Sequence, residues 1–528
     1  MKSLFVLAFV APAAAQHAGL IGVDRLKADL TFLASPALQG RLSLTPGSEV
    51  AIEWIAAEFA KAGLKPAAGG SFRQVVPLIE HRVDREASSL TVVRSGRRQD
   101  YKYGAAGFTG SFPDDVTVRA PVAFAGFGIT APEFGYDDYK GLDARGKVVL
   151  VYDHEPQESD PNSVFNGVGN TRHANARLKV LNAQAHGAVA VLLTPEPNRK
   201  HLSNAERSAR IPGSDARARR VPTQSLTDGA VKIPLLTINE AVVSELLAAS
   251  GKGASGLQGA IDRDLKPASM ALAGVTAEIR LVNAERRRGT SANVMGAIEG
   301  SDPALKSETI VFSAHYDHDG ASDAGVFAGA DDNGSGTVGV VELARAFASA
   351  GATKRTLLFA VFAAEERGLL GSYYYAAHPL RPLKSTRAVI NFDMIGRNEA
   401  PSRQTEGLIE IAADTSNELN LIGTVNSPQY RDLVESHNRE VGLKLNYKWD
   451  RDAALNIFQR SDQFPFALHE IPAVWWFTGF HPDYHQTSDT VEKINFEKMA
   501  KIVRLAYLTG RALGEAPDAP RFVAAPGK

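Results

Sequence analysis

Apolar strand-like runs and amphipathic helical patterns alternate through the second half of this chain, and this alternation limits the fold more than any other feature of the sequence. The alternation begins near Asn293, with strand-like runs at residues 309–313, 356–364 and 388–392 and helical patterns at residues 336–350 and 496–510. Alternating strands and helices form α/β domains, in which helices cover the faces of a buried sheet. We therefore predict a mixed central β-sheet flanked by helices.

The first half of the chain has a different texture. An amphipathic helix is predicted over residues 48–64, where Ile52, Ile55 and Phe59 share one face. From about residue 90 to residue 281, short β-type runs are broken by Gly and Pro, which predicts a separate β-rich unit. The Arg-rich stretch 207–220 is predicted to be a solvated loop. A length of 528 residues also favours several domains.

Composition removes several classes of function. The 58 Lys and Arg residues balance 59 Asp and Glu residues, for a net charge of −1, so the chain lacks the positive field of a nucleic-acid binder. Cysteine is absent, which excludes disulfides, thiol nucleophiles and thiolate metal sites. No GxSxG elbow occurs, which weakens a serine-hydrolase interpretation. Any metal must therefore be bound by nitrogen and oxygen ligands.

The N-terminus resembles a secretory signal. Lys2 precedes an apolar stretch at residues 4–10, and small residues follow at 13–15, which predicts cleavage after Ala15. Beyond this segment no apolar run approaches the ~18 residues that cross a bilayer. We expect an exported protein, secreted or periplasmic, without a membrane span.

Histidines and carboxylates follow the predicted strands of the second half. His315 and Asp317 end the first strand and, at a spacing of two, point to the same side. Asp331 and Asp332 lie in a glycine-rich loop just before a helix, and such adjacent acids repel each other unless a cation compensates them. The carboxyl ends of strands in α/β sheets are where ligands bind.

Three further segments repeat this pattern. Glu365 and Glu366 follow the most apolar strand, Asp393 ends the next one, and a late loop contains His481 and His485. Two histidines and three carboxylates are what two zinc-like cations ~3.5–4 Å apart need, with one carboxylate bridging them and a further carboxylate free to act as general base. Such N/O sites also accept cobalt or manganese.

These residues resemble the motifs of the M28 family of dinuclear zinc aminopeptidases. HxDH, GADDN, EE, a strand-end Asp and a late YH occur here in the order of that family, and the match covers about residues 20–85 and 290–513. The resemblance implies two Zn²⁺ ions per chain and a cis peptide bond between Asp331 and Asp332. It assigns the first zinc to His315, Asp331 and Asp393, and the second to Asp331, Glu366 and His485. It implies that Glu365 is the general base and that Asp317 orients His315.

The middle unit resembles a protease-associated (PA) domain, a type that frames active sites. The motifs are Gly126-Phe-Gly128-Ile, Tyr136-Asp-Asp-Tyr139, Gly146-Lys147-Val-Val and His186-Gly187-Ala188-Val189. Asp319 departs from the peptidase pattern, because an apolar residue often follows the histidine in that family. We therefore predict a signal peptide at 1–15, a peptidase domain at 16–86 and 286–515, an inserted domain at 87–285 and a tail at 516–528.

The resemblance implies an exopeptidase that removes N-terminal residues from peptides. The balanced charge predicts no nucleic-acid partner. Three alternatives stay open. The same scaffold supports carboxypeptidase or dipeptidase activity, a glutaminyl cyclase with one zinc, or a receptor-like binding protein without catalysis. The sequence does not indicate the oligomeric state. Arg397 and Arg460 lie near the motif segments, but the sequence does not place them relative to the metals.

Overall fold

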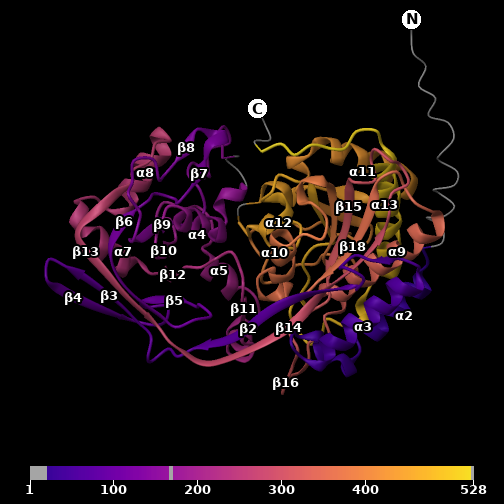
Figure 1. The fold of residues 1–528 in the computed structure, drawn as a ribbon, viewed down its shortest axis with the longest axis horizontal. Coiled ribbons are helices and arrows are strands. Elements are labelled where there is room, and N and C mark those ends of the chain that lie inside the picture. The colour runs from indigo at the N-terminus through magenta and orange to yellow at the C-terminus, as the bar shows by residue number, and fades with distance from the viewer. Residues whose placement is uncertain (1–20, 166–169, 453, 525–528) are drawn as a thin grey trace, which may run out of the picture.

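Two units, each built on its own sheet and its own hydrophobic core, lie side by side in the computed structural model (Figure 1). The structure describes residues 21–165, 170–452 and 454–524. The predicted signal peptide, residues 1–15, lies outside these ranges. Among the described residues, no helix combines the length and apolar character needed to span a membrane.

The larger unit contains a ten-stranded mixed sheet. Its strands, in spatial order, are β11 (Thr223–Leu226), β2 (Arg73–Val83), β14 (Asn283–Ile298), β18 (Thr356–Phe362), β15 (Thr309–His315), β19 (Thr386–Phe392), β22 (Ala473–Phe477), β20 (Glu418–Ile422) and β21 (Lys444–Asn446), with β1 (Lys65–Pro66) pairing with β14. The central strands β15, β18 and β22 are buried along their whole length. This is the mixed central sheet that the alternation predicts.

Helices cover both faces of this sheet, because alternate residues of the central strands point to opposite sides. One face, which includes Phe312 and Ile390, packs in a core shared with α2 (Val23–Leu33), α3 (Pro46–Lys61), α9 (Gly336–Ala350), α11 (Pro428–Val441) and α13 (Phe496–Glu515). The opposite face, which includes Val311 and Val389, packs against α10 (Leu370–Ala377) and α12 (Phe464–Ala467).

The smaller unit contains an eight-stranded sheet. Its strand order is β4 (Arg97–Lys102), β3 (Ser89–Arg94), β13 (Met270–Leu281), β6 (Val116–Phe124), β9 (Val148–Tyr152), β10 (Ala190–Thr194), β12 (Leu235–Ile238) and β5 (Phe108–Gly110). Its helices are α4 (Ala176–Ala185), α5 (Asn204–Ala209), α6 (Ser214–Arg220), α7 (Glu240–Leu247) and α8 (Ala254–Asp264). The sequence analysis predicted a separate β-rich unit in this part of the chain.

Two features join the units. The long strands β2 and β14 run side by side from one unit to the other, with Val83 paired to Asn283 at the far end (Figure 1). The short strand β11 comes from the inserted segment, yet it pairs with β2 as the edge strand of the larger sheet. The inserted segment therefore contributes to both sheets.

The prediction of a solvated loop over residues 207–220 is wrong. This stretch contains the second half of α5 and all of α6, and a capping box between Ser203 and Glu206 begins α5. Arg207 is buried, and Arg217 makes ion pairs with carboxylates of the other unit. A run of arginines gives no local sign of distant acidic partners, so composition alone suggested solvent.

Candidate metal centre

Most of the predicted site residues lie at the carboxyl ends of four parallel strands, at one edge of the larger sheet. β15 pairs in parallel with both β18 and β19, and β19 pairs in parallel with β22. His315 is the last residue of β15, Asp393 follows β19, and the short 3-10 helix η6 (Glu365–Arg367) follows β18. The loop after β22 contains His485. The sheet topology thus brings these residues together from separate segments.

Histidine and carboxylates form a first group around His315. The distance from His315 Nε2 is 3.5 Å to Asp332 Oδ1, 3.5 Å to Asp393 Oδ1 and 3.6 Å to Glu365 Oε2. His315 Nε2 is buried and has no hydrogen-bond partner. A buried imidazole nitrogen surrounded by carboxylate oxygens fits a metal-binding position, because zinc takes such nitrogen and oxygen ligands.

A second group lies on the other side of Asp332. His485 Nε2 is 3.0 Å from Asp332 Oδ2 and 3.5 Å from Glu366 Oε2. His318, which the sequence analysis did not assign, lies with Nδ1 2.7 Å from Glu366 Oε1. The two oxygens of Asp332 therefore face two separate histidine–carboxylate groups, as a bridging carboxylate would.

Asp331, which the sequence analysis placed in the bridging position, does not enter either group. Its side chain accepts hydrogen bonds from Gly396 N at 2.7 Å and Ser335 Oγ at 3.2 Å, and lies 3.2 Å from His481 Nε2. The neighbouring Asp332 occupies the position between the histidines. The cis peptide bond also lies one residue later than predicted, between Asp332 and Asn333.

Asp317 supports the acid pair of η6. Its carboxylate accepts hydrogen bonds from the backbone N–H groups of Glu365 at 3.0 Å and Glu366 at 3.3 Å. Its Oδ1 is 3.8 Å from His315 Nδ1, whereas its backbone oxygen is 3.2 Å from that nitrogen. The structure therefore places the Asp317 carboxylate beneath the Glu365–Glu366 turn, and His315 faces the Asp317 main chain.

Arg41 fixes the loops of the site from the buried side. Its fully buried guanidinium donates hydrogen bonds to four backbone carbonyls, those of Leu33, Tyr316, Ala328 and Gly329, at 2.6–2.9 Å. Burial lowers the pKa of Arg41 to about 10 despite nearby carboxylates. Arg41 thereby ties the residue after His315 to the loop that leads into Asp332.

The inserted segment supplies a cation to the same centre. Arg217 of α6 donates from Nε to Asp319 at 2.5 Å and from Nη2 to Glu366 Oε2 at 2.7 Å. Asp319 is fully buried, binds Arg367 as well, and lies 3.4 Å from His485 Nδ1. The departure that the sequence showed at Asp319 is thus explained by two arginine partners, one of them 102 residues away in the chain.

Buried acids shift one another's protonation. Burial, together with the negative charge of Glu366, raises the pKa of Asp332 well above its usual value. Burial and Asp393 likewise raise the pKa of Glu365. Carboxylates around His315 outweigh its burial and raise its pKa. Several acids this close together without solvent need compensating positive charge, which the bound cations of a dinuclear centre would supply.

A cavity of about 260 Å³ opens beside these residues. Its walls include Glu365 and Asp332, apolar Met394, Trp475 and Phe480, and the cationic side chains of Arg217 and Arg460. Arg397, by contrast, binds Asp483 at 2.8 Å. The site therefore has a pocket of mixed character, in which apolar side chains face carboxylates and two arginines.

The arrangement defines a histidine–carboxylate centre at the carboxyl edge of an α/β sheet, as in metallohydrolases. Residues 293–509 match the family model of peptidase family M28, and residues 117–246 match that of the PA domain. The chain therefore contains an M28 peptidase domain with an inserted PA domain, as the sequence motifs predicted.

Parts of this chain are similar in sequence to known proteins. It is 28% identical over 250 residues to leucine aminopeptidase 2 of Arthroderma otae, covering 43% of this chain and 46% of that protein. It is 30% identical over 220 residues to aminopeptidase YwaD of Bacillus subtilis, covering 40% and 42%. The matched region thus spans less than half the length of these curated relatives. The aminopeptidase from Aneurinibacillus sp. strain AM-1 shares the fold, with a TM-score of 0.50 and 19% identity over 96% of this chain and 97% of that one.

Proposed function

We propose that this protein is an exported zinc aminopeptidase with a dinuclear centre. The observation that best supports this proposal is the position of Asp332, whose two carboxylate oxygens face His315 on one side and His485 on the other. In this proposal His315, Asp332 and Asp393 hold one zinc ion, and Asp332, Glu366 and His485 hold the other. The matches to aminopeptidases of other organisms support the same activity.

When bound, zinc ions in such a centre supply a water of lowered pKa and polarise the scissile carbonyl. In this proposal Glu365 moves the proton. Its Oε2 lies 3.6 Å from His315 Nε2 and it lines the cavity, so it can accept a proton from water and return it to the leaving amine. The Asp317 carboxylate holds the Glu365 backbone in place for this role.

The experiment that tests the proposal compares two versions of one peptide with zinc-loaded protein. The version with a free N-terminus and an amidated C-terminus should be cleaved, and the N-acetylated version with a free C-terminus should not, because acetylation removes the amine that the centre would recognise. Mass spectrometry of the metal content should give two zinc ions at this centre. A single ion together with cyclisation of N-terminal Gln peptides would instead support a glutaminyl cyclase.

Carboxypeptidase activity is the second candidate, favoured by the two cations at the cavity border. Arg217 and Arg460 both line the cavity and could bind a terminal carboxylate. Arg217 already forms ion pairs with Asp319 and Glu366. Because it is occupied by these partners, it is less available for a substrate carboxylate, which favours the aminopeptidase proposal. Cleavage of the acetylated peptide alone would reverse that preference, and cleavage of neither peptide would favour a binding protein.

A further inference from the structure

A second cluster of histidines and carboxylates lies in the inserted domain, far along the chain from the M28 motifs. It stands after β9 and β10, two strands that pair in parallel. His154 and Glu158 follow β9, and Glu196 and His201 follow β10. The carboxyl ends of adjacent parallel strands are where α/β sheets bind ligands, so the topology alone brings these four residues to a favourable place.

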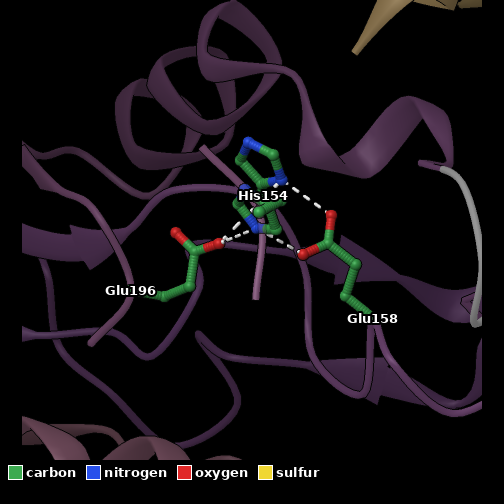
Figure 2. A group of neighbouring side chains, drawn as sticks. His154, Glu158 and Glu196 are labelled. Atoms are coloured by element: carbon green, nitrogen blue, oxygen red, sulfur yellow. Dashed lines mark hydrogen bonds and ion pairs between the residues drawn. The ribbon is translucent and has the colours of Figure 1, made fainter. Parts of the chain in front are cut away.

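The four side chains converge on one small volume. Figure 2 shows Glu158 and Glu196 pointing toward each other beside His154. His201 Nε2 lies 2.6 Å from Glu158 Oε2 and 2.6 Å from Glu196 Oε1. His154 Nδ1 lies 2.7 Å from Glu158 Oε1, and the two imidazole rings stack with centroids 3.9 Å apart. One nitrogen or oxygen atom from each residue lies within 4.8 Å of all the others.

Two of these atoms are buried without a hydrogen-bond partner. Glu196 Oε1 and His201 Nε2 make short contacts, but their directions do not meet hydrogen-bond geometry. The Glu196 side chain is only 3% exposed and that of His201 is 8% exposed. Leaving such atoms unsatisfied away from water is unfavourable. Two carboxylates that aim at the same imidazole nitrogen therefore indicate a shared cation.

Hydrogen bonds to the outer ring nitrogens determine what each histidine can do. His201 Nδ1 lies 2.9 Å from the backbone oxygen of Leu202, to which it donates, so its Nε2 lone pair faces the carboxylates. For His154 the arrangement is opposite. Arg207, which can only donate, binds His154 Nε2 at 2.9 Å, so Nδ1 bears the hydrogen and donates to Glu158.

We propose that a zinc-class divalent cation binds in the inserted domain, held by Glu158, Glu196 and His201. His154 is a positioning residue, because its Nδ1–H fixes one oxygen of Glu158 while the other oxygen faces the ion. An imidazole and two carboxylates suit zinc and related transition metals better than calcium or magnesium, which prefer oxygen ligands alone.

The geometry needs only a small adjustment to hold the ion. Ligand atoms of a tetrahedral zinc site, with bonds of ~2.0–2.1 Å, stand roughly 3.3 Å apart. The contacts of 2.6 Å at His201 Nε2 must therefore lengthen by about 0.7 Å, a shift within reach of glutamate side chains. Cavities on two sides, one lined by Glu158 and His201 and the other by Glu158 and Glu196, give room for entry and for a water as fourth ligand.

A proton is the competitor that the ion must displace. Burial would lower the pKa of His201, but Glu158 and Glu196 outweigh it and raise the pKa to about 10. A metal needs the neutral imidazole, so binding releases this proton.

The site would also fix the segment that reaches the peptidase domain. Arg207 of α5 binds His154, and donates as well to the backbone oxygen of Ala454 in the larger unit at 3.3 Å. The next helix along the chain contains Arg217, which contacts Glu366. An ion at His201 therefore stabilises the beginning of the segment that brings a cation to the M28 centre.

Metal content of the full-length chain tests the proposal. Three proteins are loaded with zinc, freed of excess metal and measured by mass spectrometry: wild type, Glu196→Gln/His201→Gln, and the control His437→Gln/Glu440→Gln, which changes the same residue types on α11. The first variant should contain one zinc ion fewer per chain than wild type and control. Equal zinc in all three, with each protein folded by circular dichroism, would overturn the proposal.

A second measurement leaves the inserted domain unchanged and is independent of the M28 centre. Zinc is titrated into Asp332→Asn/Glu366→Gln, in which the proposed catalytic ligands are disabled, against a chromophoric chelator between pH 6 and pH 8. One zinc ion should bind. No binding would contradict the proposed site. His154→Gln should weaken binding ~10–100-fold, as loss of an orienting hydrogen bond does, and an unchanged affinity would contradict its positioning role.

Discussion

Replacement of Arg41 by Met should loosen the loops of the M28 centre without changing any proposed metal ligand. Arg41 donates to four buried carbonyls, and hydrogen bonds from a charged donor contribute about 1.5–3 kcal/mol each. At the lower value the four bonds together contribute about 6 kcal/mol. Burial opposes this, since the fall of the pKa from 12.5 to about 10 corresponds to about 3 kcal/mol. The net stabilisation is therefore about 3 kcal/mol, the difference between these two contributions.

Native-state hydrogen exchange by mass spectrometry measures this loss locally, which suits a chain whose two units need not unfold together. In the metal-free protein, amides of residues 316–334 should exchange roughly a hundredfold faster in Arg41→Met than in wild type. Arg41→Lys should recover only part of the protection, because one ammonium cannot replace the planar fork that reaches all four carbonyls. Arg98→Met, which removes an exposed ion pair with Glu278, should leave these amides unchanged. Exchange in Arg41→Met within threefold of wild type would refute the reasoning.

Four other outcomes are expected. Glu365→Gln should retain zinc and lose most of kcat, because the amide keeps the shape of the side chain but accepts no proton. Glu366→Gln should instead lower the zinc content. If the two variants show the opposite results, the roles of base and metal ligand within this acid pair are reversed. Chelation should abolish hydrolysis and added zinc should restore it, so activity that survives full zinc removal would exclude a zinc enzyme. Arg217→Met removes one cation from buried Asp319, so KM should change and the melting temperature should fall by a few degrees; an unchanged KM would show that this ion pair plays no part at the site. A short linker in place of residues 87–285 removes β11 but none of the proposed M28 metal ligands. The shortened protein should therefore still bind zinc at the M28 centre and should cleave peptides with an altered KM. Loss of zinc binding would show that the insert is part of the peptidase core.

The sequence predicted those elements whose signal is local. Helix α9 begins and ends where its apolar pattern does. β15 and β19 contain their predicted runs, because buried central strands must be apolar throughout, and β18 ends at Phe362, two residues before the end of its run. The acids and histidines at strand ends were also visible, since topology places such residues at one edge. In all these cases a short window of sequence contained the relevant information.

The remaining features depend on backbone direction or on distant partners. Asp331 and Asp332 are adjacent acids, and only the local backbone of their loop, where Asp332 has φ −102° and ψ 97°, decides which one faces the histidines. Arg217 acquires its partners across the interface of two units, so its surroundings were invisible in the sequence. The same holds for Glu158 and His201, which separate strands bring together.

The pairing of β2 with β14 has a consequence for how the chain acquires its structure during synthesis. About 200 residues separate these strands, so at ~5–20 residues per second β2 waits ~10–40 s for its partner. Closing a flexible loop of that length costs about 5 kcal/mol in chain entropy. Within the inserted domain, however, β3 pairs with β13, and these strands directly adjoin β2 and β14 in the sequence. Once the insert has folded, Val83 and Asn283 are neighbours, and the long closure becomes a local one. If the inserted domain folds first, it should bring β2 and β14 into position to pair.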